Sequence, residues 1–135
     1  METRHNESTE LRPEGDRKIE GPLVSIDLPK FVNQITSEDS WFKNDRNAIT
    51  VYKTNKYRIT VVAMHSNAEM ETDKENLVSG VVSIKVLQGN LQLSANGEST
   101  SVSNGQIAVI HENIPYKLKA TETSIFLLTI AGENP

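Results

Sequence analysis

From residue 48 onward the chain consists of short apolar segments separated by turns rich in glycine, asparagine and serine, and this pattern limits the fold more than any other feature. The segments are residues 48–53, 57–64, 79–87, 90–94, 99–103, 106–111, 116–120 and 124–131. Between two of them, Asn96-Gly97 is a dipeptide that favours a two-residue hairpin turn. Short strands at close, regular spacing are typical of an all-β sandwich or barrel. No helical periodicity longer than two turns competes with them, so we predict an antiparallel β fold.

The strand segments also predict a hydrophobic core, because alternate side chains of a strand point to the same face of a sheet. On this basis we expect the core to contain Ile84, Val86, Leu91, Ile107, Val109, Phe126 and Leu128.

The first 20 residues differ from the rest of the chain. They are dense in charge, contain Pro13 and Gly15, and offer almost no apolar side chains for burial. Such a composition predicts a disordered N-terminal tail. Gly21-Pro22 marks its end, so we expect residues 21–135 to form a single domain.

Four segments outside the main strand series have patterns of their own. Residues 23–28 alternate well enough for a first strand, and the apolar spacing in residues 30–35 predicts one or two helical turns. Residues 37–42 are expected to form a loop that contains the only tryptophan, Trp41. Acidic residues at alternating positions within 69–76 predict an exposed acidic loop.

Composition excludes several classes of function. The formal net charge is −4 and the 14 Lys and Arg residues are scattered, so we expect no nucleic acid partner. With no cysteine there is no disulfide framework, no cysteine zinc site and no thiol nucleophile. The chain has neither a signal-peptide pattern nor an apolar run of the ~20 residues that a membrane span needs, so we expect a cytoplasmic protein without membrane contact.

Two glycine-bounded segments carry a resemblance to a known family. Gly80-Val-Val-Ser-Ile-Lys-Val-Leu-Gln-Gly89 resembles G-x-V-S-V-x-V-L-x-G. Gly105-Gln-Ile-Ala-Val-Ile with Ile114-Pro115-Tyr116 resembles the family's glycine segment followed by V-P-H. On these motifs, residues 48–131 look like a small single-domain cupin of the conserved-barrel, RmlC-like type. The resemblance implies a cupin-type antiparallel jelly-roll barrel, preceded here by a short N-terminal helix, and a homodimer formed through barrel edges.

The chain departs from the family at the residues that bind metal. The family's first motif has two histidines and a glutamate, and the glutamate falls on Val82. Depending on the frame, its histidines fall on Asp73 and Glu75, on Glu75 and Leu77, or on Asn76 and Val78. The histidine of the second motif falls on Tyr116. A catalytic transition metal needs several imidazoles and a carboxylate around one point, so we expect neither a metal nor another cofactor.

The same positions define a candidate pocket for a small organic ligand at the barrel mouth. Its residues are Tyr116, His111, Met64, His65, Asp73, Glu75 and Val82. Tyr116 either hydrogen-bonds the ligand or fills the space of the missing metal site. His111 is either a general base oriented by Glu112 or an ordinary loop histidine. His65 faces the barrel interior if it shares a strand face with Val61 and Ala63, and is otherwise a hydrogen-bonded core or rim residue.

Two other groups have open alternatives. Asp73 and Glu75 have the spacing of ligands for a hard cation such as calcium, but the same spacing recurs in solvated acidic loops. Trp41 and Phe42 either cover one end of the barrel, anchor a dimer contact, or pack in the core.

Two functions fit these residues. The first is a metal-free cupin-like protein that binds or senses a small molecule without catalysis, and therefore has no catalytic residues. The second is a metal-independent epimerase or isomerase that acts on a small polar metabolite, with His111 as base and Tyr116 as acid. The sequence favours the first, because the additional basic residues that would hold a sugar nucleotide are not evident.

Overall fold

The computed structural model describes residues 2–9, 12, 15–72 and 79–132. Within them the helices are α1 (Leu28–Ile35) and α2 (Asp39–Lys43). The strands are β1 (Arg4–Asn6), β2 (Arg17–Glu20), β3 (Arg46–Lys53), β4 (Tyr57–Met64), β5 (Glu69–Glu71), β6 (Val81–Gln88), β7 (Asn90–Ala95), β8 (Glu98–Ser103), β9 (Ile107–Ile110), β10 (Tyr116–Ala120) and β11 (Ser124–Ala131).

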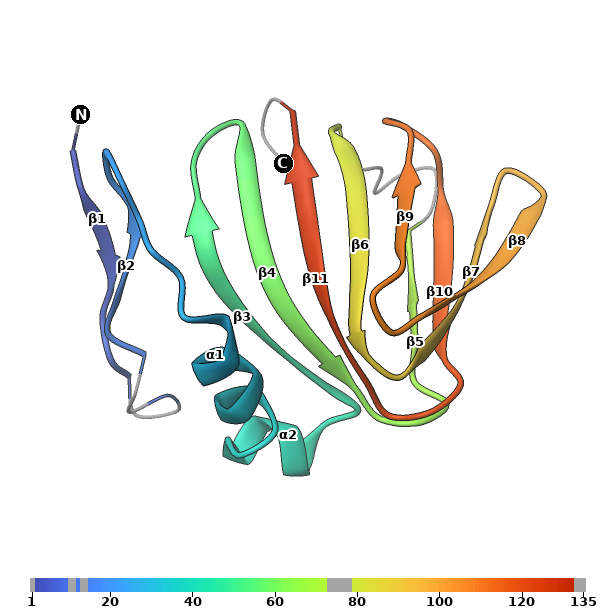
Figure 1. Ribbon diagram of the computed structural model, residues 1–135, viewed down its shortest axis with the longest axis horizontal. Helices are drawn as coiled ribbons and strands as arrows, with labels where there is room; N and C mark the ends of the chain where they lie inside the picture. Colours follow the sequence, from blue (N-terminus) through green and yellow to red (C-terminus); the bar gives the residue numbers. More distant parts are fainter. Residues whose placement is uncertain (1, 10–11, 13–14, 73–78, 133–135) are drawn as a thin grey trace.

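Two antiparallel sheets form the body of the protein (Figure 1). In the described residues one sheet has five strands in the order β3-β4-β11-β6-β9, and the other has four in the order β5-β10-β7-β8. All strand pairs are antiparallel, and chain neighbours such as β6 and β7 lie in different sheets. This is the jelly-roll architecture, and it confirms the predicted all-β fold. None of the helices in the described residues is long and apolar enough to cross a membrane.

The core between the two sheets contains most of the side chains that alternation assigned to it. Ile84, Val86, Leu91 and Phe126 are all buried there, and Leu128 packs against them half-buried. We predicted Ile107 and Val109 in the core as well, and this was wrong, since they are 58% and 65% exposed.

The register of β9 explains the error. Ile110 pairs with Val82 and Ala108 pairs with Ile84, and both of these partners are buried in the core. Directly paired residues point to the same face of a sheet, so Ala108 and Ile110 face inward. The segment Ile107–Ile110 is apolar at every position. Its sequence therefore does not specify whether residues 107 and 109 or residues 108 and 110 face the core.

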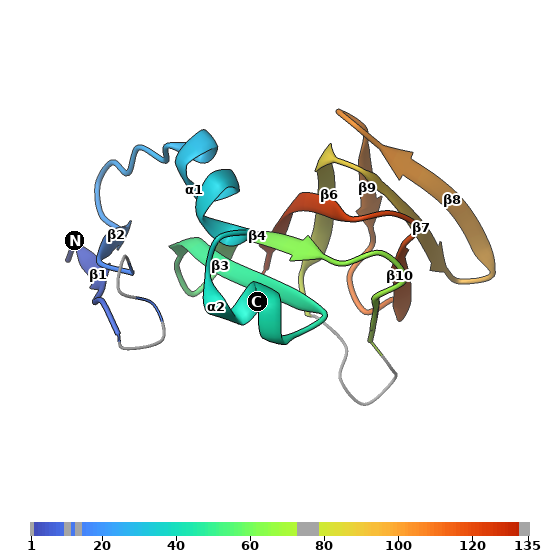
Figure 2. The same cartoon turned by 90° about the horizontal axis from the view of Figure 1, so that it is seen from below.

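Both helices cover the outer face of the five-stranded sheet near β3 and β4, while the β7–β8 hairpin lies at the far side of the molecule (Figure 2). Phe31 and Ile35 of α1 and Trp41 of α2 form a second buried cluster with Ile49 and Val61. This confirms the predicted helical turns in residues 30–35. The loop predicted for residues 37–42 was partly wrong, because α2 begins at residue 39.

The strand predicted for residues 23–28 does not form. Instead α1 begins at Leu28, where the Asp27 side chain accepts a hydrogen bond from the main-chain N–H of Lys30 at 3.4 Å. Pro29 lies in the first turn, where a helix does not need its missing N–H. The capping residue and the proline therefore favour the start of a helix here, although the apolar residues before it alternate as they do in a strand.

The segment predicted as a tail contains the β1–β2 hairpin, and we call its described residues 2–9, 12 and 15–20 the N-terminal arm. Guanidinium groups attach the arm to the outer edge of β3. Arg12 Nη2 donates to the Ala48 carbonyl at 2.8 Å, Arg17 Nε donates to the Thr50 carbonyl at 2.7 Å, and Arg4 donates to the Lys53 carbonyl. The arm thus docks mainly through polar contacts, which a composition argument based on apolar burial does not detect.

Glu38, which precedes α2, also holds the N-terminal arm in place. Its carboxylate accepts hydrogen bonds from Arg12 Nε at 2.9 Å, Gln34 Nε2 at 3.0 Å and Asn47 Nδ2 at 2.9 Å. Burial raises the pKa of Glu38, but the hydrogen bonds from Gln34, Arg12 and Asn47 outweigh burial and hold this pKa below its ordinary value. Glu38 therefore remains a carboxylate that orients Arg12.

The predicted acidic loop also differs from the structure, because its first residues form β5 on the edge of the four-stranded sheet. Met70 pairs with Leu118, which is fully buried, while Glu69 and Glu71 pair with lysines of β10. Lys117 Nζ lies 3.6 Å from a Glu69 carboxylate oxygen. The acidic residues are thus the solvent face of a strand whose partner strand is basic. Asp73 and Glu75 lie outside the described residues.

Candidate functional site

Of the positions that correspond to the family's metal ligands, the structure describes Val82 and Tyr116, and both are packed inside the barrel. Val82 on β6 and Tyr116 on β10 are 2% and 5% exposed, and Met64 at the end of β4 is fully buried. All three belong to one buried cluster with Phe126. The structure thus brings three of the candidate pocket residues together, but in the core.

Tyr116 has the electrostatic character of a buried phenol. Burial raises its pKa above the ordinary value, and the positive charge of Arg58 opposes this rise only in part. A higher pKa makes the hydroxyl a weaker acid at neutral pH. The phenol is therefore poorly suited to protonate a substrate, and its ring fills the barrel interior.

His65 lies on the other side of the five-stranded sheet. Val61 and Ala63 belong to the buried cluster under the helices. The face of β4 that carries these two residues therefore points toward the helices and not into the barrel. The His65 Nε2 atom lies 2.8 Å from the Trp41 carbonyl oxygen, and its ring stacks on the indole with 3.5 Å between centroids and 12° between planes. These contacts hold His65 away from the barrel interior.

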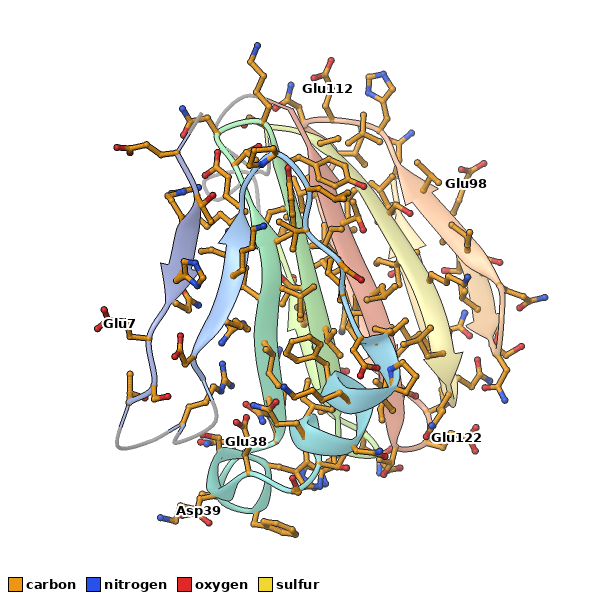
Figure 3. All side chains as sticks on the ribbon, turned by 60° about the vertical axis from the view of Figure 1, so that its left-hand side comes forward. Glu7, Glu38, Asp39, Glu98, Glu112 and Glu122 are labelled. Atoms are coloured by element: carbon orange, nitrogen blue, oxygen red, sulfur yellow. The ribbon has the colours of Figure 1, made fainter. Side chains whose placement is uncertain are left out.

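His111 lies in the connection between β9 and β10 and is exposed. Its Nδ1 atom is 3.1 Å from the main-chain carbonyl oxygen of Glu112, so its observed partner is the peptide group and not the carboxylate. Glu112 and Glu98 both lie toward one end of the molecule, away from Glu38 and Glu122 (Figure 3). The connection that contains His111 therefore lies at this end of the molecule.

These residues do not fit the metal of a catalytic cupin. Val82 has no donor atom, and Tyr116 offers one phenol oxygen in an apolar cluster. His65 and His111 lie on different sides of the five-stranded sheet. Within the described ranges 2–9, 12, 15–72 and 79–132, no group of three or more His, Cys, Asp or Glu side chains could hold a metal ion. The donors needed for metal chemistry are not assembled in this part of the chain.

A cavity does open at the mouth, between the edge strands of the two sheets, and we call it the β8–β9 groove. It measures about 560 Å³ and is lined by Leu93, Ala95, Asn96, Glu98, Ser99, Thr100, Ala108, Val109, Ile110, His111 and Ile114. Leu93, Ala108 and Ile110 supply an apolar floor, because they lie on the inner faces of β7 and β9. Polar groups of Glu98, Thr100 and His111 line the same space.

The sequence interpretation missed Glu98 and Thr100, although a signal was present. Thr100 pairs with Leu93, and Glu98 pairs with Ala95, so both polar residues lie on the inner face of the four-stranded sheet. In a strand whose alternate residues face the other sheet, a polar residue at one of these inward positions indicates that the two sheets separate there. Tyr116 does not line this groove, but borders a separate hollow on the other side of Glu98, next to Pro115 and Lys117.

Comparison with known proteins identifies the fold. No family model and no curated protein matches the chain. Among solved structures, a conserved Streptococcus pyogenes protein of unknown function is similar over 87% of this chain and 93% of its own, with 20% identity and a TM-score of 0.62. A cupin superfamily protein from Desulfitobacterium hafniense is similar over 67% of this chain and 80% of its own, with 9% identity and a TM-score of 0.61.

A further similar structure is an enzyme. The salicylate 1,2-dioxygenase from Pseudaminobacter salicylatoxidans matches 76% of this chain but only 33% of its own, with 18% identity and a TM-score of 0.64. At 20% identity or less, these structures share only the fold of the chain. The chain thus has the fold of a small cupin domain, as its two motifs predicted, and its function has to be argued from its own residues.

Proposed function

We propose that this chain with a cupin fold is a metal-free module that binds a small organic molecule in the β8–β9 groove without catalysing a reaction. The observation that carries the proposal is the combination of a filled barrel interior with an open groove beside it. Val82, Met64 and Tyr116 fill the interior, whereas Leu93 and Ile110 form an apolar floor in the groove.

The groove has the composition of a site for a small amphiphilic ligand. Its volume of about 560 Å³ lies within the range of small-molecule sites, which are mostly apolar with few polar groups that fix orientation. The Glu98 carboxylate can accept a hydrogen bond from an N–H or O–H of a ligand, and the Thr100 hydroxyl can donate or accept one. We therefore expect a mainly apolar molecule with a hydrogen-bond donor at one end.

The arrangement of His111 and Tyr116 supports binding over epimerase or isomerase chemistry. An acid and a base acting on one substrate both have to come within about 2.6–3.2 Å of it, directly or through one water. His111 lines the β8–β9 groove, whereas Tyr116 lies in the core and borders a different hollow. The raised pKa of Tyr116 also disfavours its use as an acid at neutral pH.

Filling the groove tests this proposal. We expect Thr100→Trp to weaken binding of the neutral fluorescent probe N-phenyl-1-naphthylamine by about tenfold or more, equivalent to about 1.4 kcal/mol, because the indole occupies the space above the apolar floor. The measurement is a fluorescence titration. Gln92→Trp is the matched control, since Gln92 is exposed on the neighbouring strand and does not line the groove.

The Gln92→Trp variant should bind the probe as the unchanged protein does. Equal affinity of the two tryptophan variants, or no saturable binding by the unchanged protein, would contradict a binding site in the β8–β9 groove.

A further inference from the structure

The chain contains two Asn-Gly pairs, Asn96-Gly97 and Asn104-Gly105, and the structure holds them differently. An asparagine followed by glycine is prone to deamidation, because the main-chain nitrogen of a glycine reaches the side-chain amide carbon without obstruction by a Cβ atom. Both pairs lie in turns between strands, and all four residues are exposed. Exposure to water therefore does not distinguish the two pairs, and their hydrogen bonds have to be compared.

The pair Asn104-Gly105 is held by hydrogen bonds at both reacting groups. The Asn104 Oδ1 atom accepts a hydrogen bond from the Gly89 N–H at 2.7 Å, and the Gly105 N–H donates to the Val86 carbonyl at 2.8 Å. Because Val86 belongs to the buried core, the second partner is fixed in place. The nitrogen of Gly105 and the amide carbon of Asn104 approach each other only after these bonds break.

The pair Asn96-Gly97 lacks these constraints. It forms the turn between β7 and β8, with φ of 52° at Asn96 and 79° at Gly97, and the strands pair on either side of it through Ala95 and Glu98. Within the residues that the structure describes, neither the Asn96 amide nor the Gly97 N–H has a hydrogen-bond partner. A Cβ atom added at Gly97 would meet no atom within 4 Å, so the space around this glycine is open.

We propose that Asn96 is a site of spontaneous deamidation in the folded protein and that the fold protects Asn104. The Gly97 nitrogen gives its proton to a base in the solvent and attacks the Asn96 amide carbon, ammonia leaves, and a succinimide ring forms. Water then adds to either carbonyl of the ring and gives aspartate or isoaspartate. The net reaction consumes one water and releases one ammonia, so it requires no oxidant, reductant or cofactor.

The products change the rim of the β8–β9 groove. Either product replaces a neutral amide by a carboxylate that is ionised at neutral pH, and Asn96 and Glu98 both line this groove. Isoaspartate also adds a carbon to the main chain in the turn that sets the register of β7 against β8. A modified chain therefore has two carboxylates at the rim, and the isoaspartate form has a lengthened turn.

Peptide mapping of protein aged at neutral pH tests the proposal. A glutamate-specific protease that cleaves after Glu98 and Glu112 places the two asparagines on different peptides. In the folded protein we expect Asn96 to convert about tenfold or more faster than Asn104, because the reaction of Asn104 first has to break hydrogen bonds. Gly97→Ala should slow the conversion of Asn96, because the added methyl group obstructs the attacking nitrogen.

The denatured protein is the matched control. In guanidinium chloride neither pair keeps its hydrogen bonds, so the two rates should become similar. No conversion of Asn96, equal rates in the folded protein, or a rate ratio that persists after denaturation would overturn the proposal. Mass spectrometry and isoaspartate-specific methylation detect the products without any ligand, so the result is independent of probe binding in the β8–β9 groove.

Discussion

Replacing Phe126 by alanine is expected to lower the free energy of unfolding by about 3–5 kcal/mol, the usual cost of removing a buried phenylalanine side chain. Phe126 is fully buried on β11, and its strand partners are Val62 on β4 and Val86 on β6. Its ring lies in the cluster that occupies the barrel interior. The loss includes both the transfer free energy of the ring and the cavity left behind. Chemical denaturation monitored by circular dichroism measures the difference.

Phe42→Ala is the control with the same change of side chain. Phe42 belongs to α2 but is 71% exposed, so its removal should change the free energy of unfolding by no more than about 0.5 kcal/mol. If the two variants lost similar stability, the assignment of Phe126 to the centre of the core would be wrong.

Replacing Gly89 by alanine is expected to cost about 2–4 kcal/mol of stability, from backbone strain and steric overlap together. Gly89 joins β6 to β7 with φ of 102°, a region that side chains disfavour. A Cβ atom there would lie 2.7 Å from the Thr123 carbonyl oxygen and would also meet the Ser124 hydroxyl. The Ser124 hydroxyl itself accepts a hydrogen bond from Asn90 N–H at 3.0 Å. Thermal and chemical unfolding of the variant measure the cost.

Gly97→Ala separates the two contributions. Gly97 lies in the β7–β8 turn with φ of 79°, but a Cβ atom added there meets no atom within 4 Å. This variant should lose only about 1 kcal/mol, from backbone strain alone. A loss for Gly97→Ala as large as that for Gly89→Ala would show that the close approach of Ser124 to Gly89 is not the cause.

The parts of the fold that the sequence predicted well are those where periodicity and turn residues agree. The strands around Gly89 and the Asn96-Gly97 turn are examples, because alternation and left-handed glycine positions both mark their boundaries. Periodicity failed at β9, where every residue is apolar and only the pairing with β6 fixes the inner face. It also failed before α1, where a capping aspartate and a proline outweigh the alternation.

The candidate site was predictable only in part. The motif positions predicted Val82 and Tyr116 as residues of a ligand pocket at the barrel mouth, and the structure buries both in the core. Whether such residues line a cavity or fill it depends on packing between two sheets. The orientation of His65 depends on Trp41, which lies 24 positions earlier in the chain. Glu98 and Thr100 contribute to a groove because two edge strands separate, and edge strands follow from the topology rather than from local sequence.

The metal content of the purified protein tests the central claim most directly. The barrel interior is packed with Val82, Met64 and Tyr116 at the place where a metal-dependent cupin needs donor atoms. Elemental analysis after expression in medium supplemented with iron, nickel, manganese and zinc should therefore find far less than one ion per chain. About one tightly held ion of any of these metals per chain would contradict the account, since such retention needs several converging ligands.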